Sequence, residues 1–304
     1  MSETGVKVFE AVMLPLQRLP LGFHYAWGRA FAWVAEHVLR YRRDVVLTNL
    51  ARSFPDAGYG ELRQMSHGFY AHLGEIVAET LWFGGCKGRP GRLVRQGIVR
   101  IPDSGELFAS FSERPGGVMI LGSHWGNWEL FGGMFQYFGD RTPEEIPVTK
   151  EQVCVVYKRL ENRFWDRFMA DNRCAVLEGL PGYVESREVL RYAVAHRGEK
   201  RFYIFSTDQF PYRFATRHQV PSFLGQVTQV MTGGAALAHK LSLAVYYLGM
   251  ERTERGKYEM TFRKICEDAS QMEPEAVMER FCALLEADVR RQPANYLWSH
   301  KRWK

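Results

Sequence analysis

The sequence predicts an α/β protein in which a mixed, largely parallel sheet is flanked by helices and preceded by an N-terminal helical segment. Short apolar runs rich in β-branched and aromatic residues alternate with stretches of helical periodicity from about residue 94 to the C-terminus. Strands separated by helices favour parallel pairing within one sheet. No Pro/Gly/Ser-rich linker and no internal repeat divides the 304 residues. We therefore expect residues 1–56 to form the helical segment and residues 57–304 to form a single α/β domain.

Each expected element follows from its local pattern. Residues 61–83 carry apolar side chains three or four positions apart, which predicts one long helix, and the glycine-rich stretch from Gly84 ends it. The expected strands are residues 94–101, 117–122, 153–157, 202–206, 243–250 and 257–265. The expected helices between and after them are residues 105–113, 126–138, 160–172, 183–196, 230–241 and 274–291. Ligands of such sheets gather where strands end and helices begin.

The composition limits the classes of function. The net charge of +6 and the isoelectric point near 9.0 are compatible with binding to nucleic acid or to an anionic membrane. No RNP, KH or zinc-finger pattern occurs, so we expect no nucleic-acid partner. The five cysteines are scattered, and none forms a CxxC pair or stands near a histidine at ligand spacing. This makes a disulfide scaffold or a structural zinc site improbable and indicates reduced thiols on a protein that faces the cytosol.

The N-terminal region has no signal-peptide pattern, and its apolar stretches are too short or too often interrupted to predict a membrane span. Residues 6–40 nevertheless combine aromatic and aliphatic side chains with arginines, and Arg40, Arg42 and Arg43 extend the basic character. Rings and cations together suit the headgroup region of an anionic membrane. We expect residues 1–56 to lie on a membrane surface; the alternative is an ordinary helix pair packed on the domain.

The most informative stretch is "ILGSHWGNWEL", in which an expected strand ends in a turn that contains His124. Glu129 stands five positions on, in the first turn of the next expected helix, where it can accept the proton on one imidazole nitrogen. The other nitrogen can then take a proton from a substrate hydroxyl, as a general base does. The alternative is a histidine that caps a helix beside an unrelated glutamate. No GxSxG, P-loop or HExxH pattern occurs in the chain.

"GSHWGNWE" resembles the first motif of the lipid A biosynthesis acyltransferases of the late, lauroyl/myristoyl type, which share an H-x4-D/E signature with glycerolipid acyltransferases. "YRRDVVLTNLARSFPD" resembles the N-terminal signature of this family and "VVYKRLENRFWDRFM" its second block. "STDQF" and "VPSFLGQVTQVMTGGAALAHKLSLAV" resemble the third block, and "PANYLWSHKRWK" ends the chain as family members end. The resemblance covers nearly the whole chain, and it implies a glycerolipid-acyltransferase-like fold.

The resemblance also implies an activity. A fatty acyl chain would pass from acyl carrier protein, or from coenzyme A, to a hydroxyl of a lipid A precursor at the cytoplasmic face of the inner membrane. His124 would be the general base and Glu129 its partner; a thioester is already activated, so no metal and no cofactor is expected. The runner-up acceptors are an aminolipid, a mannosylated phosphoinositide or a lysophospholipid. The rival outside catalysis is a lipid-binding relative that keeps the fold.

A second pair of polar residues is expected near the histidine. Asp208 and Gln209 match the family's DQ pair and follow the expected strand 202–206. If that strand neighbours the one before His124, the pair lies beside the histidine, because parallel strands end at the same edge of a sheet. The pair either holds loops by hydrogen bonds or contacts the acceptor.

The second block supplies further candidates for substrate binding. Lys158 stands where the family commonly has an arginine, and a lysine lacks the bidentate fork with which a guanidinium holds a phosphate or carboxylate. Arg159 follows it, and Asn162 matches the family. The alternative for the two cations is a solvated loop.

The remaining candidates lie beside the histidine and at the C-terminus. We expect Trp125 and Asn127 to contact substrate, with Trp125 lining an apolar groove for the acyl chain; the alternative is that the aromatic residues are core. The further aromatic candidates for this groove are Trp128, Phe131 and Phe135. At the C-terminus we expect His300 and Arg302 to lie near the site, with the basic groups facing lipid phosphate.

Overall fold

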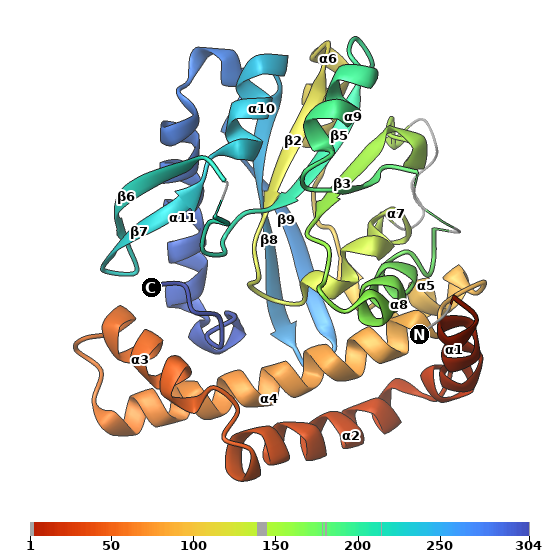
Figure 1. Cartoon of the computed structure of the whole chain (residues 1–304), viewed down its shortest axis with the longest axis vertical. Helices are drawn as coiled ribbons and strands as arrows, with labels where there is room; N and C mark the ends of the chain where they lie inside the picture. The colour runs from red at the N-terminus through yellow and green to blue at the C-terminus, as the bar shows by residue number, and fades with distance from the viewer. Residues whose placement is uncertain (1–2, 139–144, 178, 180, 214, 304) are drawn as a thin grey trace.

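A seven-stranded sheet forms the centre of the computed structural model (Figure 1). The model describes residues 3–138, 145–177, 179, 181–213 and 215–303; residues 1–2 and Lys304, at the outer ends of the two expected segments, lie outside the described residues. The strands are β1 (Val99–Arg100), β2 (Gly117–Gly122), β3 (Val153–Tyr157), β4 (Tyr183–Glu185), β5 (Arg201–Ser206), β8 (Ala244–Glu254) and β9 (Lys257–Cys266). Their order is β1-β9-β8-β2-β5-β3-β4, and every neighbouring pair is parallel except the β8–β9 hairpin. The expected mixed, largely parallel sheet is confirmed.

The central strand β2 fixes the position of the turn that follows it. All six of its residues are buried, as is usual for a parallel strand that is covered on both faces. Alternate side chains enter the two halves of the core, with Met119 and Leu121 on one side and Val118 and Ile120 on the other. Because β2 is paired along its length with β5 and β8, the chain leaves it at a defined point in a defined direction.

Helices cover both faces of this sheet. α9 (Val189–Ala195), α10 (Gly233–Leu241) and α11 (Pro274–Arg291) contribute buried side chains to the half of the core that includes Leu121. The helices that contribute to the other half include α5 (Pro90–Gln96), α6 (Gly105–Glu113), the 3-10 helix η2 (Trp128–Gly133) and α7 (Met134–Tyr137). α8 (Arg163–Arg173) lies near η2, where its last residue becomes important for the site.

A layer of helices lies beneath the sheet in the view of Figure 1. The long helix α4 (Tyr59–Gly84) runs across the end at which β2 and β8 finish, and α2 (Leu21–Trp33) lies along α4 on its far side. The other elements of this layer are α1 (Glu3–Gln17), the π-helical turn η1 (Val34–Val38) and α3 (Arg43–Ser53). A Cβ atom on Gly28 would lie 2.4 Å from the carbonyl oxygen of Gly74, so the backbones of α2 and α4 are in contact. The N-terminal region is helical, as expected, while the division at residue 56 stays a prediction.

Two expected elements begin well after their predicted start, and one hairpin was not predicted. Residues 94–96 are helical and not extended, because α5 continues until Gly97 takes the left-handed conformation (φ +55°). The expected helix 183–196 begins only at Val189, since β4 precedes it and pairs with β3 at the edge of the sheet. The antiparallel hairpin of β6 (Arg217–Phe223) and β7 (Gln226–Met231) was not predicted. No helix within the described ranges is both long enough and apolar enough to cross a membrane.

Candidate active site

His124 lies in the turn between β2 and η2, here called the His124 turn (residues 123–127). Because β2 and β5 are parallel neighbours with Gly122 opposite Ser206, the residues that follow the two strands emerge side by side. Asp208 follows β5 by two residues and reaches His124 directly. The expected position of the Asp208–Gln209 pair beside this turn is therefore confirmed.

Asp208 holds both the backbone and the ring of His124. One carboxylate oxygen lies 2.6 Å from Nδ1 of the ring, and the other accepts a hydrogen bond of 2.9 Å from the backbone N–H of His124. Burial alone raises the pKa of Asp208, but the nearby ring, its two hydrogen bonds and the charge of Arg302 outweigh burial and lower it. An ionised Asp208 can only accept, so the ring proton is on Nδ1 and Nε2 has a free lone pair.

The predicted contact between Glu129 and the ring of His124 is not present. Both carboxylate oxygens of Glu129 accept hydrogen bonds of 2.7 Å from the guanidinium of Arg173, and one also accepts from the indole N–H of Trp128 at 3.0 Å. Burial alone raises the pKa of Glu129, but Arg173, Trp128 and the more distant His124 together lower it. Glu129 is thus paired with a partly exposed arginine that comes from the last turn of α8.

The second ring nitrogen of His124 faces a side chain and solvent. The amide Nε2 of Gln209 lies 3.2 Å from Nε2 of the ring, so the amide can donate to the nitrogen that Asp208 leaves unprotonated. The ring of Trp128 packs edge-on against the imidazole, with 4.8 Å between the centroids. The His124 side chain keeps 15% of its surface exposed, compared with 3% for Asp208. The Nδ1 side of the ring is therefore enclosed by a buried carboxylate, and the Nε2 side meets the neutral amide of Gln209.

Backbone amides of the His124 turn are already engaged by the protein. The N–H of His124 donates to Asp208, that of Trp125 to Ser123 and that of Gly126 to the carbonyl of Asn295. These three N–H groups are occupied within the protein, so they are not free to donate to a developing oxyanion. The amide of Gln209 is a side-chain donor placed at the Nε2 side of the ring.

The whole sequence was also compared with models of protein families. The model of the bacterial lipid A biosynthesis acyltransferases matches residues 3–304. The chain belongs to this family. It is therefore an acyltransferase, and the family implies a lipid A-type acceptor. Among curated proteins, none is significantly similar to the chain.

The second block of this acyltransferase follows β3, which ends at the same edge of the sheet as β2 and β5. Lys158 is exposed, and its ammonium group lies 4.3 Å from the centre of the Tyr212 ring. Arg159 is exposed and approaches Asp166 at 3.9 Å. Asn162 instead caps α8, because its side-chain oxygen accepts from the backbone N–H groups at the start of that helix. In the structure Asn162 therefore has a structural role, which is to fix the start of α8.

Three other candidates are too deeply buried to contact a substrate in this structure. Trp125 is 1% exposed and belongs to the hydrophobic core, as the alternative interpretation held for the aromatic residues. Asn127 is fully buried and caps η2 by accepting from the backbone N–H of Glu129. Arg302 is 3% exposed and donates to the carbonyl of Gln229, so its guanidinium faces the interior and not a lipid phosphate. Its charge acts on Asp208.

The C-terminal segment does pack near the site, and the N-terminal signature holds it there. The side chain of Asn49 donates hydrogen bonds of 2.9 Å to the carbonyls of Trp298 and His300, and Arg42 donates to the carbonyl of Ser299. His300 is partly exposed and contributes its backbone to this contact. The sequence did not predict these contacts, although the asparagine belongs to the N-terminal signature. No group of three or more potential metal ligands occurs among the described residues.

Proposed function

We propose that this acyltransferase moves a fatty acyl chain from a thioester of acyl carrier protein, or of coenzyme A, to a hydroxyl of a lipid A precursor, with His124 as the general base. The observation that carries the proposal is the contact of 2.6 Å between Nδ1 of His124 and Asp208, which holds the ring proton on Nδ1 and leaves the basic lone pair on Nε2. Family membership supplies the reaction class and the type of acceptor. The carboxylate beside the base is Asp208 in this proposal and not Glu129.

The proposed reaction needs one proton to move twice. Nε2 of His124 removes the proton of the acceptor hydroxyl as its oxygen attacks the thioester carbonyl carbon, and Asp208 stabilises the imidazolium that forms. The tetrahedral intermediate then expels the thiolate, which takes the proton from Nε2 and leaves as the free thiol. The new ester bond replaces the thioester bond, so base catalysis is sufficient without a metal or a cofactor.

Gln209 has two consecutive roles in this proposal. In the resting site its amide lies 3.2 Å from Nε2 of His124, so the acceptor hydroxyl must displace it before the base can act. The displaced amide stays close to the reacting carbonyl and can donate a hydrogen bond to the developing oxyanion. This role is needed because the N–H groups of residues 124–126 are engaged elsewhere.

Cationic groups at the sheet edge that carries the site suit anionic substrates. Lys158 and Arg159 are exposed after β3, and Arg173 is partly exposed while it holds Glu129. The acidic surface of a carrier protein and the phosphates of a lipid A precursor are both attracted to such a patch. Parallel assays with acyl carrier protein and coenzyme A thioesters identify the donor; the proposal expects turnover with at least one of them.

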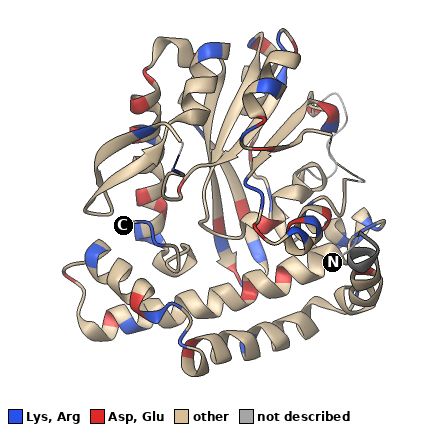
Figure 2. Ribbon diagram, in the orientation of Figure 1, with Lys and Arg blue, Asp and Glu red and all other residues tan. Residues whose placement is uncertain are grey.

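We further propose that α2 and η1 lie on the cytoplasmic face of the inner membrane. Among the exposed large apolar side chains of these helices, five recur every three or four positions and so form one stripe: Phe23, Trp27, Phe31, Val34 and Val38. The opposite face is buried against α4. Arg29 is the only Lys, Arg, Asp or Glu in α2, which is otherwise uncharged in Figure 2. A continuous exposed stripe of this kind is unusual on a free surface and suits the lipid interface.

Vesicle binding tests the membrane proposal. Trp27→Glu/Phe31→Glu should reduce co-sedimentation with vesicles that contain phosphatidylglycerol by about tenfold. The variant loses two aromatic side chains that the proposal inserts into the lipid interface. Val194→Glu is the control, since Val194 is 74% exposed on α9, far from α2 (Figure 1). Equal binding of the double variant and the control would contradict the proposal.

The acyl-transfer proposal is tested with purified enzyme, labelled acyl donor and a lipid A precursor. His124→Ala should lower turnover by on the order of 10³ and leave the melting temperature nearly unchanged. His218→Ala is the matched control, because His218 forms a histidine–carboxylate pair with Glu279 at 2.9 Å outside the site. An aminolipid, a phosphoinositide mannoside and a lysophospholipid serve as competing acceptors. Transfer to one of these in preference to the lipid A precursor, or full activity of His124→Ala, would overturn the proposal.

A further inference from the structure

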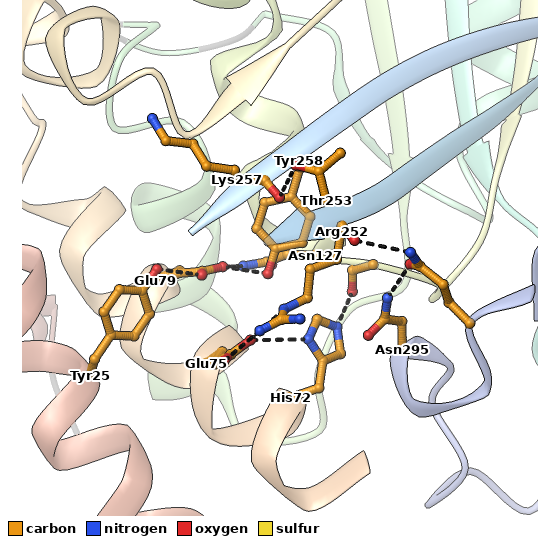
Figure 3. Close-up of polar contacts among 12 residues, drawn as sticks. Tyr25, His72, Glu75, Glu79, Asn127, Arg252, Thr253, Lys257, Tyr258 and Asn295 are labelled. Carbon is orange, nitrogen blue, oxygen red and sulfur yellow. Dashed lines mark hydrogen bonds and ion pairs between the residues drawn. The ribbon is translucent and has the colours of Figure 1, made fainter. Parts of the chain in front are cut away.

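One face of α4 presents polar side chains to the rear of the His124 turn (Figure 3). His72, Glu75 and Glu79 stand three and four positions apart and therefore share this face. Nε2 of His72 lies 3.2 Å from the carbonyl oxygen of Gly126, and Oε2 of Glu79 accepts a hydrogen bond of 2.7 Å from Nδ2 of Asn127. Two consecutive residues of the turn are thus held from the side opposite the substrate.

Asn127 passes this contact on to the site. Its side-chain NH₂ donates to Glu79, while its side-chain oxygen accepts a hydrogen bond of 3.1 Å from the backbone N–H of Glu129. The same amide group therefore joins α4 to the first turn of η2. Glu129 and Trp128 lie in that turn, and these residues hold Arg173 and pack against the ring of His124.

Glu79 joins three other parts of the fold at one point. It is fully buried, and it accepts hydrogen bonds from the hydroxyl of Tyr25 on α2 (2.7 Å), the hydroxyl of Tyr258 on β9 (2.8 Å) and Asn127. All three partners are uncharged. Burial raises the pKa of Glu79, and the three hydrogen bonds oppose burial without cancelling it. A carboxyl group is costly to bury, and an apolar side chain of similar volume suits a purely packing role better.

The hydrogen bond from Tyr25 makes the position of the Glu79 side chain depend on α2. Tyr25 and Gly28 lie one turn apart on the buried face of α2. At Gly28 the two helices approach backbone to backbone, so α2 cannot shift on α4 without moving the Tyr25 hydroxyl. The hydrogen bonds of Glu79 with Tyr25 and with Asn127 therefore connect α2, the helix with the exposed apolar stripe, to the His124 turn.

We propose that Glu79 is a positioning residue for acyl transfer: through Asn127 it sets the start of η2, and through Tyr25 it makes that setting depend on the docking of α2. This inference rests on the proposed function. It predicts that loss of the acceptor atoms at position 79 lowers kcat and leaves the KM values of donor and acceptor nearly unchanged, because Glu79 does not contact either substrate. Tyr25→Phe, which removes one hydroxyl, should lower kcat in the same direction by about threefold.

The main experiment compares Glu79→Gln, Glu79→Met and Tyr70→Phe in steady-state acyl transfer. The amide of Glu79→Gln can accept from Asn127 and Tyr258 through its oxygen and donate to Tyr25 through its NH₂, so kcat should stay within about twofold. Glu79→Met keeps the volume without an acceptor, and kcat should fall at least tenfold. Tyr70→Phe is the matched control, because the Tyr70 hydroxyl, also on α4, bonds to the carbonyl of Tyr41 away from the turn.

A polarity exchange distinguishes positioning from general stability. Asn127→Asp alone places a second carboxyl against Glu79, and kcat should fall at least tenfold. In Glu79→Gln/Asn127→Asp the amide at 79 donates to the carboxylate at 127, and that carboxylate still accepts from the N–H of Glu129. The double variant should recover kcat to within about threefold of the parent enzyme. Recovery does not require Glu79→Met to fold, so the inference can be tested even if that variant does not.

Amide hydrogen exchange of the peptide that contains residues 122–130 provides a readout independent of turnover. Asn127→Asp should accelerate exchange there about tenfold, and the double variant should restore protection. If the parent enzyme transfers no acyl chain while exchange follows this pattern, the proposed function fails and the structural link stands. If the parent enzyme is active but the double variant is no better than Asn127→Asp, or if Glu79→Met raises KM and leaves kcat unchanged, the inference is overturned.

Discussion

The two sides of the His124 turn use buried carboxyl groups in opposite ways. On the substrate side, Asp208 pairs with the ring of His124 and Glu129 with the guanidinium of Arg173, and the pKa of each carboxyl is lowered. On the rear side, Glu79 accepts only from two tyrosines and Asn127, and burial raises its pKa. The pKa values of chemically similar groups are thus shifted in opposite directions on the two sides of the turn.

This difference indicates a division of work. Ionised carboxylates beside the ring fix its tautomer and stabilise positive charge, which a general base requires. A carboxyl group whose hydrogen-bond donors are all uncharged is not paired with a cation; it fixes geometry by its three hydrogen bonds. If a substrate-side carboxylate can be neutralised without loss of catalysis, this distinction between the two sides of the turn is wrong.

The largest expected effect belongs to Asp208→Asn. The amide can present its NH₂ to Nδ1 and so favour the tautomer with the proton on Nε2, where the base needs a lone pair. We expect kcat to fall by on the order of 10³ with little change in KM. Steady-state kinetics of the folded variant, checked by its melting curve, measures this. A loss smaller than tenfold would show that Asp208 does not direct the ring.

Glu129→Gln should have an intermediate effect on turnover. Glu129 does not touch the ring in the structure, so its loss acts through Trp128, through Arg173 and through its own charge. We expect kcat to fall by about tenfold, which corresponds to about 1.4 kcal/mol of transition-state stabilisation. The comparison with Asp208→Asn is decisive. A larger loss for Glu129→Gln would restore the pairing of His124 with Glu129 that the H-x4-E spacing suggested.

The pH dependence of stability should have opposite signs for Glu129 and Glu79. Because the folded-state pKa of Glu129 is lowered, its ionisation stabilises the fold above about pH 4.5, and this is lost as the pH falls through the folded-state value. The pKa of Glu79 is raised, so its contribution is complete below about pH 4.5 and is lost as the pH rises through the folded-state value.

Melting curves between pH 2 and pH 8 test these signs. The deficit of Glu129→Gln relative to the parent enzyme should grow as the pH rises toward about 4.5 and stay constant above it, by on the order of 3 °C per kcal/mol. Glu79→Gln, which carries no titrating group, should gain on the parent enzyme as the pH rises above about 4.5. Parallel curves for both variants would mean that the pKa values of the two glutamates are not shifted in opposite directions.

The smallest effect is expected at the exposed cation of the site. Lys158→Ala should raise KM for the acceptor about threefold at low salt and have almost no effect at 0.5 M salt, because exposed charges are strongly screened. Lys158→Arg should retain the parent KM. A salt-independent change in kcat for Lys158→Ala would place this residue among the reacting groups.

The sequence was sufficient to predict where the site lies but not which carboxylate pairs with His124. The apolar run of residues 117–122 predicted β2, and parallel pairing with the strand before Asp208 predicted that the DQ pair lies beside His124. A spacing of five residues does not determine where the Glu129 side chain points. That depends on Arg173, 44 residues away, which takes both oxygens of Glu129. Competition between Arg173 and His124 for the carboxylate of Glu129 leaves no local pattern in the sequence.

Two other features were hidden for different reasons. Asn127 looked like a substrate residue because it neighbours the histidine, whereas its role depends on Glu79, which resembled one more polar position of a long helix. The β6–β7 hairpin contains polar residues at several positions and Pro221, so its hydrophobic alternation is weak. Both features arise from tertiary contacts, which periodicity does not report.

The ring of His124 gives the most direct test of the account. In a ¹H–¹⁵N spectrum of protein labelled in its histidines, we predict a strongly hydrogen-bonded Nδ1–H proton that is assigned by its loss in His124→Ala. The account predicts that this resonance survives in Glu129→Gln and disappears or moves markedly upfield in Asp208→Asn. Its survival in Asp208→Asn together with its loss in Glu129→Gln would contradict the account.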